Sequence, residues 1–503
     1  MDLRGFLKRL EEVGQLLVVD EEVDRDLQAS ALCALSNRSG GPAAHFKKVK
    51  GYPDWSLAGS LLTGPSNLLS RPERPWSRQA LALGLPANAD YETFMGTLLE
   101  RWLQPIPPIT VSTGPCKDVI LRGPDADLGK LPIPRLTARD GGAYGTMGVV
   151  AVRDPETGQQ HCGWYRWMVV DGGRLALSPQ HLTAPFLPRS GLAAIHAKYR
   201  AAGRPMPVAI VMGGDPAYLM AAAMFLPPEA DQTSITGGLR REPLTLAKAE
   251  TADVFIPADA EVVIEGEVSA DEMVQEGPFP QLIWWTPLSP APLLRVTAVT
   301  HRQSPILPFS AEGEKYSDAL SLISTCVSLA LFRFTKETMG RPVRWLYCPP
   351  ETLMAFCVAS MWVMHSGHPA IIARHVHAHP LAGWFDKILV CEEEVEPADW
   401  QQILQELTEK ANPATQWQKI LGAPSFTQRV YANSDEKHKV PATRMYVTAF
   451  SPTWWDKTWI GKRISFENSF PEAVRQRVVA RWKELGLPGE PVIKKPVPVP
   501  QPR

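Results

Sequence analysis

The sequence predicts a mixed α/β (α+β) fold built from more than one domain. Its 503 residues are long enough for two or three domains with substantial cores. A middle block of short strands rich in β-branched residues precedes a long proline-free helical stretch, after which strands alternate with helices. These observations predict a sheet-rich central domain, a linking helix and a C-terminal α/β domain.

The first 110 residues, assigned to an N-terminal α/β region, mix helices with loops rich in Pro and Gly. Apolar spacing predicts helices over residues 3–13 and 92–103. The start, "MDLRGFLKRLEEVGQLLVVD", carries charges through its apolar positions. It therefore predicts a helix that runs into a strand and not a signal peptide.

Residues 111–312 are predicted to form a sheet or barrel decorated with helices. A helix is expected over residues 215–225, because an Asp near its start can serve as N-cap. Strands are expected over residues 144–154, 164–177, 208–214, 260–268 and 293–302.

The C-terminal part begins with a predicted linking helix over residues 313–340, where "KYSDALSLISTCVSLALFRFTKETMG" has helical spacing and a terminal glycine. Residues 341–485 alternate strands ("VRWLYC", "KILVCEEEVE") with helices ("ADWQQILQELTEK", "PEAVRQRVVARWKELGL"), which predicts an α/β domain. Residues 486–503 form a Pro-rich tail, typical of polyproline-like or disordered chain.

Charge, hydropathy and cysteine content exclude several classes of function and partner. The net charge of −1 favours neither nucleic acid nor an anionic membrane as partner. The apolar run over residues 354–364 is far shorter than the roughly 20 residues that span a bilayer. Seven scattered cysteines without a C-x-x-C pair argue against a disulfide framework and for a reducing compartment. We expect a soluble cytoplasmic protein. The signatures G-x-G-x-x-G, Walker A, H-E-x-x-H and G-x-S-x-G are absent.

Two segments of the middle block could bind an anion or a metal. In "QQHCGWYRWMVV", Arg166 follows His161 and could hold a carboxylate or phosphate with its guanidinium fork; the alternative is a surface Arg beside a Trp. In "LSPQHLTAP", His181 after Gln180 could be a metal ligand, or an ordinary loop histidine.

The stretch "QEGPFPQLIWW" could carry proton chemistry. The Gly-Pro turn lets Glu276 and Gln281 face one pocket, and desolvation beside Trp284 and Trp285 would raise the pKa of a carboxyl toward values useful for general acid catalysis. The alternative is a solvent-exposed loop acid. Gln281 offers the reach of a second acid without its ability to titrate.

Five histidines gather in "HSGHPAIIARHVHAHP". If residues 375–379 formed a strand, His375, His377 and His379 would share one face, which could bind zinc, nickel or iron. No acidic residue in the run could orient the rings, so a solvated or interface face is the alternative.

Taken together, the segments "DADLGKLPIPRLTARDGGAYGTMGVVAVRDPETG", "GWYR", "SPQH", "IPADAEVVIEGEV", "EGPF" and "WFDKILVCEEEVEPADWQQILQEL" resemble, in order, the UbiD family of reversible (de)carboxylases. The resemblance implies a split β-barrel flavin-binding domain over residues 111–312 and a C-terminal domain that makes a homodimer or homohexamer. It also implies prenylated FMN, supplied by a flavin prenyltransferase, with plain FMN as the fallback. The implied reaction is decarboxylation of an aromatic, heteroaromatic or α,β-unsaturated carboxylic acid through a prenylated FMN adduct.

The resemblance also implies residue roles. Arg166 matches the Arg that anchors the carboxylate, Glu276 matches the first acid of the catalytic network and carries the proton, and Gln281 stands where the second acid belongs. The implied cofactor-binding residues are His161, Trp164, Tyr165, Arg166, Gln180, His181 and Gln232.

The implied metal ligands are His161, His181 and Gln232, and two of them depart from the family pattern. His161 stands in place of an Asn and Gln232 in place of a Glu. Mn²⁺ or Mg²⁺, with K⁺ as a possible companion, is the implied cation, and these changes predict weaker binding, a softer metal or none. Glu242 could replace the missing carboxylate if its loop were rearranged.

Three functions stay open on the sequence: a decarboxylase, a family member that binds flavin but catalyses a proton-shuffling reaction such as isomerisation, and a non-catalytic subunit. Retention of Arg166, Glu276 and His181 argues against the non-catalytic subunit, because a purely structural protein has no need of these three residues.

Overall fold

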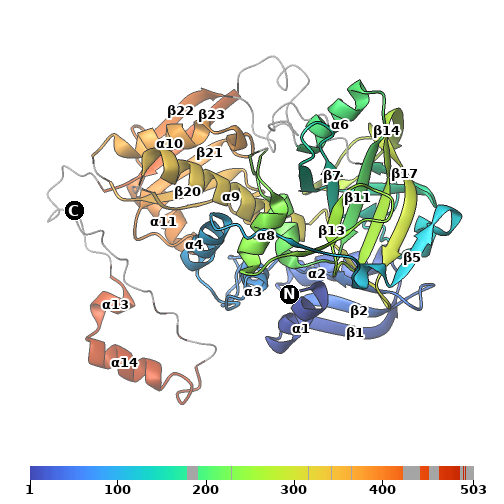
Figure 1. Cartoon of the computed structure of the whole chain (residues 1–503). Coiled ribbons are helices and arrows are strands. Elements are labelled where there is room, and N and C mark those ends of the chain that lie inside the picture. The colour runs from blue at the N-terminus through green and yellow to red at the C-terminus, as the bar shows by residue number, and fades with distance from the viewer. Residues whose placement is uncertain are drawn as a thin grey trace.

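The computed structural model has the expected mixed α/β architecture. It describes residues 1–177, 191–227, 229–314, 316–340, 343–363, 365–422, 442–451, 464–487, 491 and 493. In Figure 1 the blue N-terminal elements lie below a large green and yellow sheet, and the orange C-terminal sheet lies on the other side of the molecule. The long helix α9 (Asp318–Met339) packs on the first strand of that C-terminal sheet, as the predicted linking helix should.

The N-terminal region forms a four-stranded sheet in the order β1-β2-β3-β18. Its strands are β1 (Leu16–Val23), β2 (Ala43–Val49), β3 (Ser56–Gly59) and β18 (Ile306–Phe309). Its helices are α1 (Leu3–Glu12), α2 (Gln28–Arg38), α3 (Ser77–Ala82) and α4 (Tyr91–Trp102), so the two helices predicted here are present. β18 comes from far along the chain and pairs in parallel with β3, which ties the N-terminal sheet to the segment that leads into α9.

The central domain is organised by a nine-stranded sheet in which neighbouring strands run antiparallel. Its strands are β5 (Val119–Arg122), β6 (Tyr144–Gly145), β7 (Gly148–Arg153), β8 (Gln160–Trp164), β9 (Trp167–Asp171), β10 (Arg174–Leu177), β11 (Met206–Met212), β14 (Val262–Glu276) and β17 (Ser289–His301). The strand predicted over residues 164–177 is a hairpin instead, because Gly172 and Gly173 turn the chain between β9 and β10.

Smaller elements surround this sheet. They are the helices α6 (Gly191–Ala201), α7 (Pro216–Ala223) and α8 (Gln232–Arg240), the strands β4 (Ile109–Val111), β12 (Thr245–Lys248) and β13 (Phe255–Pro257), the hairpin β15 (Pro280–Gln281) with β16 (Trp284–Trp285), and the 3-10 helices η1 (Pro115–Lys117), η2 (Gly123–Asp125) and η3 (Leu128–Lys130). The carboxylate of Asp215 accepts a hydrogen bond from Ala217 N (2.8 Å), so it caps α7 as predicted.

The C-terminal domain contains a five-stranded sheet in the order β19-β20-β21-β23-β22. Its elements are β19 (Val343–Tyr347), η4 (Pro350–Thr352), β20 (Phe356–Met361), α10 (His368–Ala378), η5 (Pro380–Gly383), β21 (Lys387–Glu392), α11 (Trp400–Lys410), β22 (Trp417–Gly422) and β23 (Ala442–Ala449). The helices α13 (Phe466–Ser469) and α14 (Glu472–Ala480) follow and lie apart from the sheet in Figure 1.

The strand considered for residues 375–379 is wrong, because α10 runs through residue 378. His375 on this helix and His379 just after it both contact the ring of Phe334, with ring centroids 4.5 and 4.6 Å away. His377 points elsewhere, packs against Phe385 and donates to Met445 O at 3.3 Å. The three rings do not share a face, and the described residues hold no group of three or more His, Cys, Asp or Glu placed to bind a metal.

All seven cysteines are buried free thiols, as a reducing compartment would allow. Within the described ranges α9 is long and apolar enough to cross a membrane, but 78% of its most apolar window is buried inside the protein. It is therefore a core helix.

We expect Gly145→Ala to destabilise the fold. A methyl group on Gly145 would lie 2.1 Å from the indole ring of the fully buried Trp167, the neighbour of Arg166. Overpacking of this kind costs about 1–3 kcal/mol in the free energy of unfolding, measurable by urea denaturation. Gly96→Ala in α4 is the control, because its methyl meets nothing within 4 Å and should stabilise the helix by about 0.5–1 kcal/mol. Equal stabilities for the two variants would contradict the packing argument.

Candidate active site

Arg166 lies in the short connection between β8 and β9 and is buried, with only 9% of its surface exposed. The neighbouring Trp167 begins β9 and is fully buried in the core of the sheet. Trp164, at the end of β8, donates its indole N–H to Thr146 O at 2.7 Å. The surface location considered for Arg166 is therefore wrong, and its guanidinium must find buried partners.

Those partners are Glu276 and Gln281. Nε and Nη2 of Arg166 donate to the two carboxylate oxygens of Glu276 at 3.0 and 3.1 Å, and Nη1 donates to Gln281 Oε1 at 3.1 Å. Glu276, the last residue of β14, has no exposed surface, so it is not a loop acid in water. The structure thus brings together the three predicted catalytic residues.

Two further residues complete this cluster. Tyr144 Oη donates to Glu276 Oε1 at 3.1 Å, and burial together with the charge of Glu276 raises the pKa of the tyrosine hydroxyl above its usual range. The guanidinium of Arg166 lies 4.3 Å from the ring centroid of Phe279, a cation–π contact. Phe279 belongs to the motif "EGPF", so the sequence offered a signal for its contact with Arg166. No motif in the sequence indicated Tyr144 as a partner of Glu276.

A second buried acid, Glu312, lies in the loop between β18 and α9. Ser310 Oγ and Ser317 Oγ donate to its two carboxylate oxygens, the latter at 3.1 Å. Burial raises the pKa of Glu312 to about 7; the two serine hydroxyls and the charge of Arg166 oppose this rise, and Asp318 adds to it. The sequence "SAEGE" carried no motif that singled this residue out.

A cavity with a volume of about 210 Å³ lies beside Glu312, and this volume is well above the roughly 30 Å³ that one water occupies. Pro280, Ile283 and Trp284 of the β15–β16 hairpin line it, as do Leu136 and Glu312, and α2 contributes the opposite wall. It is largely apolar, with a few polar groups, which suits a flat organic ligand.

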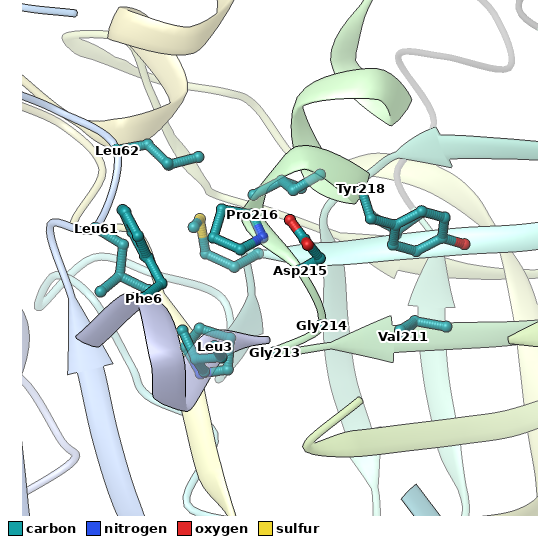
Figure 2. Close-up of a pocket in the computed structure, with 14 residues that line it drawn as sticks. Leu3, Phe6, Leu61, Leu62, Val211, Gly213, Gly214, Asp215, Pro216 and Tyr218 are labelled. Atoms are coloured by element: carbon teal, nitrogen blue, oxygen red, sulfur yellow. The ribbon is translucent and has the colours of Figure 1, made fainter. Parts of the chain in front are cut away.

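Figure 2 shows a different cavity, between α1 and the start of α7. Its volume is about 30 Å³, and Leu3, Phe6, Asp215 and Tyr218 are among its lining residues. The Asp215 carboxylate there is neutralised by the N-terminal amine at 2.9 Å. No predicted site residue lines either cavity, but Pro280 and Trp284, which flank Gln281 in the β15–β16 hairpin, line the larger one, so we place the active site there.

The predicted metal ligands lie on neighbouring elements. Gln232, the first residue of α8, has its amide Nε2 3.3 Å from Nδ1 of His161 on β8, and its Oε1 accepts from Cys162 N at 3.3 Å. His161 Nε2 lies 3.2 Å from Tyr165 Oη. Gln180 and His181 lie outside the described residues.

This donor set does not fit a hard divalent cation. Among the described members, a neutral imidazole and an amide hydrogen-bond to each other and contribute no carboxylate. The adjacent Asp231 is used as N-cap of α8, and the exposed Glu242 pairs with Arg240 at 2.7 Å. Glu242 therefore does not replace the missing ligand. Neutral N–H donors of this kind fit a flavin phosphate better.

Comparison with known proteins identifies the family. Three models match successive parts of the chain: the N-terminal (residues 7–98), Rift-related (109–315) and C-terminal (321–449) domains of 3-octaprenyl-4-hydroxybenzoate carboxy-lyase. The chain belongs to the UbiD family. It is therefore a member of a family of carboxy-lyases.

Individual relatives agree with this assignment. A pyrrole-2-carboxylic acid decarboxylase of Pseudomonas aeruginosa is 28% identical over 97% of this chain and 98% of its own. The UbiD-class enzyme HmfF of Pelotomaculum thermopropionicum in complex with FMN has a TM-score of 0.81 and 25% identity over 94% of this chain and 100% of its own. An evolved dimeric form of HmfF in complex with prFMN has a TM-score of 0.77 and 25% identity over 94% and 99%.

We expect Glu276→Gln to destabilise the protein, because it leaves the buried Arg166 cation without its anion. Breaking a buried ion pair from one side costs about 3 kcal/mol or more in the free energy of unfolding. Glu272→Gln, on the same strand but in an exposed pair with Arg295, should change it by less than about 1 kcal/mol. Denaturant unfolding of both variants compares the two, and equal losses would show that the Arg166–Glu276 pair is not specially buried.

Proposed function

We propose that this protein is a decarboxylase that acts on an aromatic, heteroaromatic or α,β-unsaturated carboxylic acid with prenylated FMN as cofactor. The observation that carries the proposal is the buried pair of Arg166 and Glu276 with Gln281, whose hairpin neighbours Pro280 and Trp284 line a largely apolar cavity. The activity of the Pseudomonas relative on pyrrole-2-carboxylic acid supports an unsaturated ring as substrate.

The need for a cofactor follows from the reaction. Loss of CO₂ from an sp² carbon leaves negative charge that no side chain can stabilise, and bound prenylated FMN would supply the electron sink. The FMN and prFMN complexes of HmfF support this choice, with plain FMN as the fallback. The residues proposed to hold it are His161, Trp164, Tyr165, Arg166, Gln180, His181 and Gln232.

The roles of the chain's own residues follow from their chemistry. Arg166 presents a planar fork that can bind the substrate carboxylate through two parallel hydrogen bonds. Glu276 is the proton donor or acceptor of this pair, and Tyr144 fixes its carboxylate. Gln281 can orient Arg166 but cannot exchange a proton.

We also propose a bound cation, an oligomeric state and a source of the cofactor. His161, Gln232 and His181 are the candidate ligands of a cation, with Mn²⁺ or Mg²⁺ disfavoured by the missing carboxylate and K⁺ as a possible companion. We further propose a cytoplasmic homodimer or homohexamer that receives its cofactor from a flavin prenyltransferase; the evolved dimeric form of HmfF supports a dimer as one possible assembly.

The amide of Gln281 favours one second candidate, a flavin-dependent isomerase. Such a reaction moves a proton without releasing CO₂, so it needs Glu276 but not a second acid at position 281. A non-catalytic subunit would have no use for a buried Arg–Glu pair beside a cavity, which argues against that role.

We expect protein co-expressed with a flavin prenyltransferase to carry prenylated FMN and to release CO₂ from a screen of aromatic and unsaturated acids. Absorbance, mass spectrometry of the released cofactor and metal analysis on one sample test the cofactor, and CO₂ detection tests the reaction. Protein that contains only FMN, or that exchanges a substrate hydrogen for deuterium without CO₂ release, would favour the isomerase.

We expect Glu276→Gln to lower turnover at least about 100-fold, the usual contribution of a general acid or base. Glu272→Gln is the control, because that side chain lies on the same strand but faces solvent. Unchanged turnover in Glu276→Gln, with cofactor bound, would reject both catalytic functions.

A further inference from the structure

The active site lacks a second proton carrier in the hairpin, because position 281 holds an amide that accepts from Arg166. Both carboxylate oxygens of Glu276 accept hydrogen bonds from the Arg166 cation, at 3.0 and 3.1 Å. Both oxygens are thus turned to the guanidinium, and neither Glu276 nor Arg166 is among the residues that line the 210 Å³ cavity. The other partner of Arg166, Gln281, has no proton to exchange at neutral pH.

Glu312 is placed to fill this gap. It lines the 210 Å³ cavity together with Pro280 and Trp284, which flank Gln281 in the β15–β16 hairpin. Glu312 comes from a different part of the chain, after β18, yet the charge of Arg166 acts on its carboxyl group. Its partners are neutral hydroxyls and not a cation.

We propose that Glu312 is the second proton carrier of this site and replaces the acid that Gln281 lacks. This inference rests on the proposed decarboxylase function. It adds a catalytic residue at the cavity wall, in a loop that contributes no resemblance to the family motifs quoted above.

The surroundings of Glu312 suit a group that gains and loses a proton near neutral pH. Burial raises its pKa to about 7, and the neighbouring Asp318 acts in the same direction, whereas the hydroxyls of Ser310 and Ser317 and the charge of Arg166 act against it. A hydroxyl can both donate and accept, so the two serines can pair with either protonation state. A catalytic acid works best when its pKa lies close to the operating pH.

The proposed step balances. The bond between the substrate carbon and its carboxylate breaks, CO₂ leaves, and the electron pair stays on the carbon; bound prenylated FMN would supply the electron sink. The proton of the Glu312 carboxyl forms the new C–H bond, which leaves Glu312 as an anion. Water that enters the cavity returns a proton to Glu312.

The test compares Glu312→Gln with Glu351→Gln in the cofactor-loaded enzyme. Glu351 is a matched control, because it is another carboxyl with a raised pKa that accepts from a serine hydroxyl, but it lies on η4 and not at the cavity. We expect Glu312→Gln to lower kcat about 100-fold or more and to abolish a decline of wild-type kcat above pH about 7. Glu351→Gln should keep the wild-type rate and pH profile.

An infrared titration of the protein without cofactor gives an independent readout. We expect a carboxyl C=O band that disappears as the pH rises through about 7 and that is missing from Glu312→Gln but present in Glu351→Gln. A wild-type rate and pH profile in Glu312→Gln, or the absence of this band at pH 6, would overturn the inference. Loaded wild-type protein that releases no CO₂ would instead reject the proposed function, while the infrared titration would still decide whether Glu312 stores a proton.

A second variant guards against a folding defect. Gln281→Glu in the Glu312→Gln background returns a carboxyl to the hairpin beside Arg166, and we expect it to restore at least part of the lost kcat. Failure of this rescue, with cofactor bound and thermal stability unchanged, would argue that Glu312 and position 281 do not share one role and would overturn the inference.

Discussion

The buried ion pair between Arg166 and Glu276 is the interaction on which the rest of the site depends. Two charges removed from water are stable only when their remaining hydrogen-bonding groups are also satisfied. Here Tyr144 donates a hydrogen bond to Glu276, and Gln281 accepts one from Arg166. The ring of Phe279 faces the guanidinium. Each of these residues comes from a strand end or a tight turn, so the geometry of the sheet fixes the geometry of the charges.

The position of the cavity follows from the pairing of a late strand, β18, with the N-terminal sheet. β18 pairs with β3 of the N-terminal sheet, and the loop after it carries Glu312 before Ser317 caps α9. The N-terminal helix α2, the central hairpin β15–β16 and this loop therefore meet around one space. Ligand sites commonly form where structural units meet in this way, because each unit can contribute chemistry that none could position alone.

The site contains two carboxyl groups in contrasting environments. Glu276 is fixed by a cation, whereas Glu312 is surrounded by hydroxyls and apolar walls. Two carboxyl groups with such different partners can take different parts in one reaction. An amide at position 281 is thus compatible with proton transfer, since the second acid can come from another element.

The sequence by itself determined the mixed α/β class, the long linking helix, the capped start of α7 and the family, because these depend on local periodicity and on motifs read in order. It also singled out Arg166, Glu276 and Gln281. Only the tertiary structure decided which groups face them: Tyr144 and Glu312 lie 132 residues before and 36 residues after Glu276, and no local pattern links them. The tertiary structure also showed that the histidines near the end of α10 point in different directions. The alternation of side chains assumed for a strand does not apply to a helix. The physical reason is that burial and charge pairing are properties of residues brought together from distant segments.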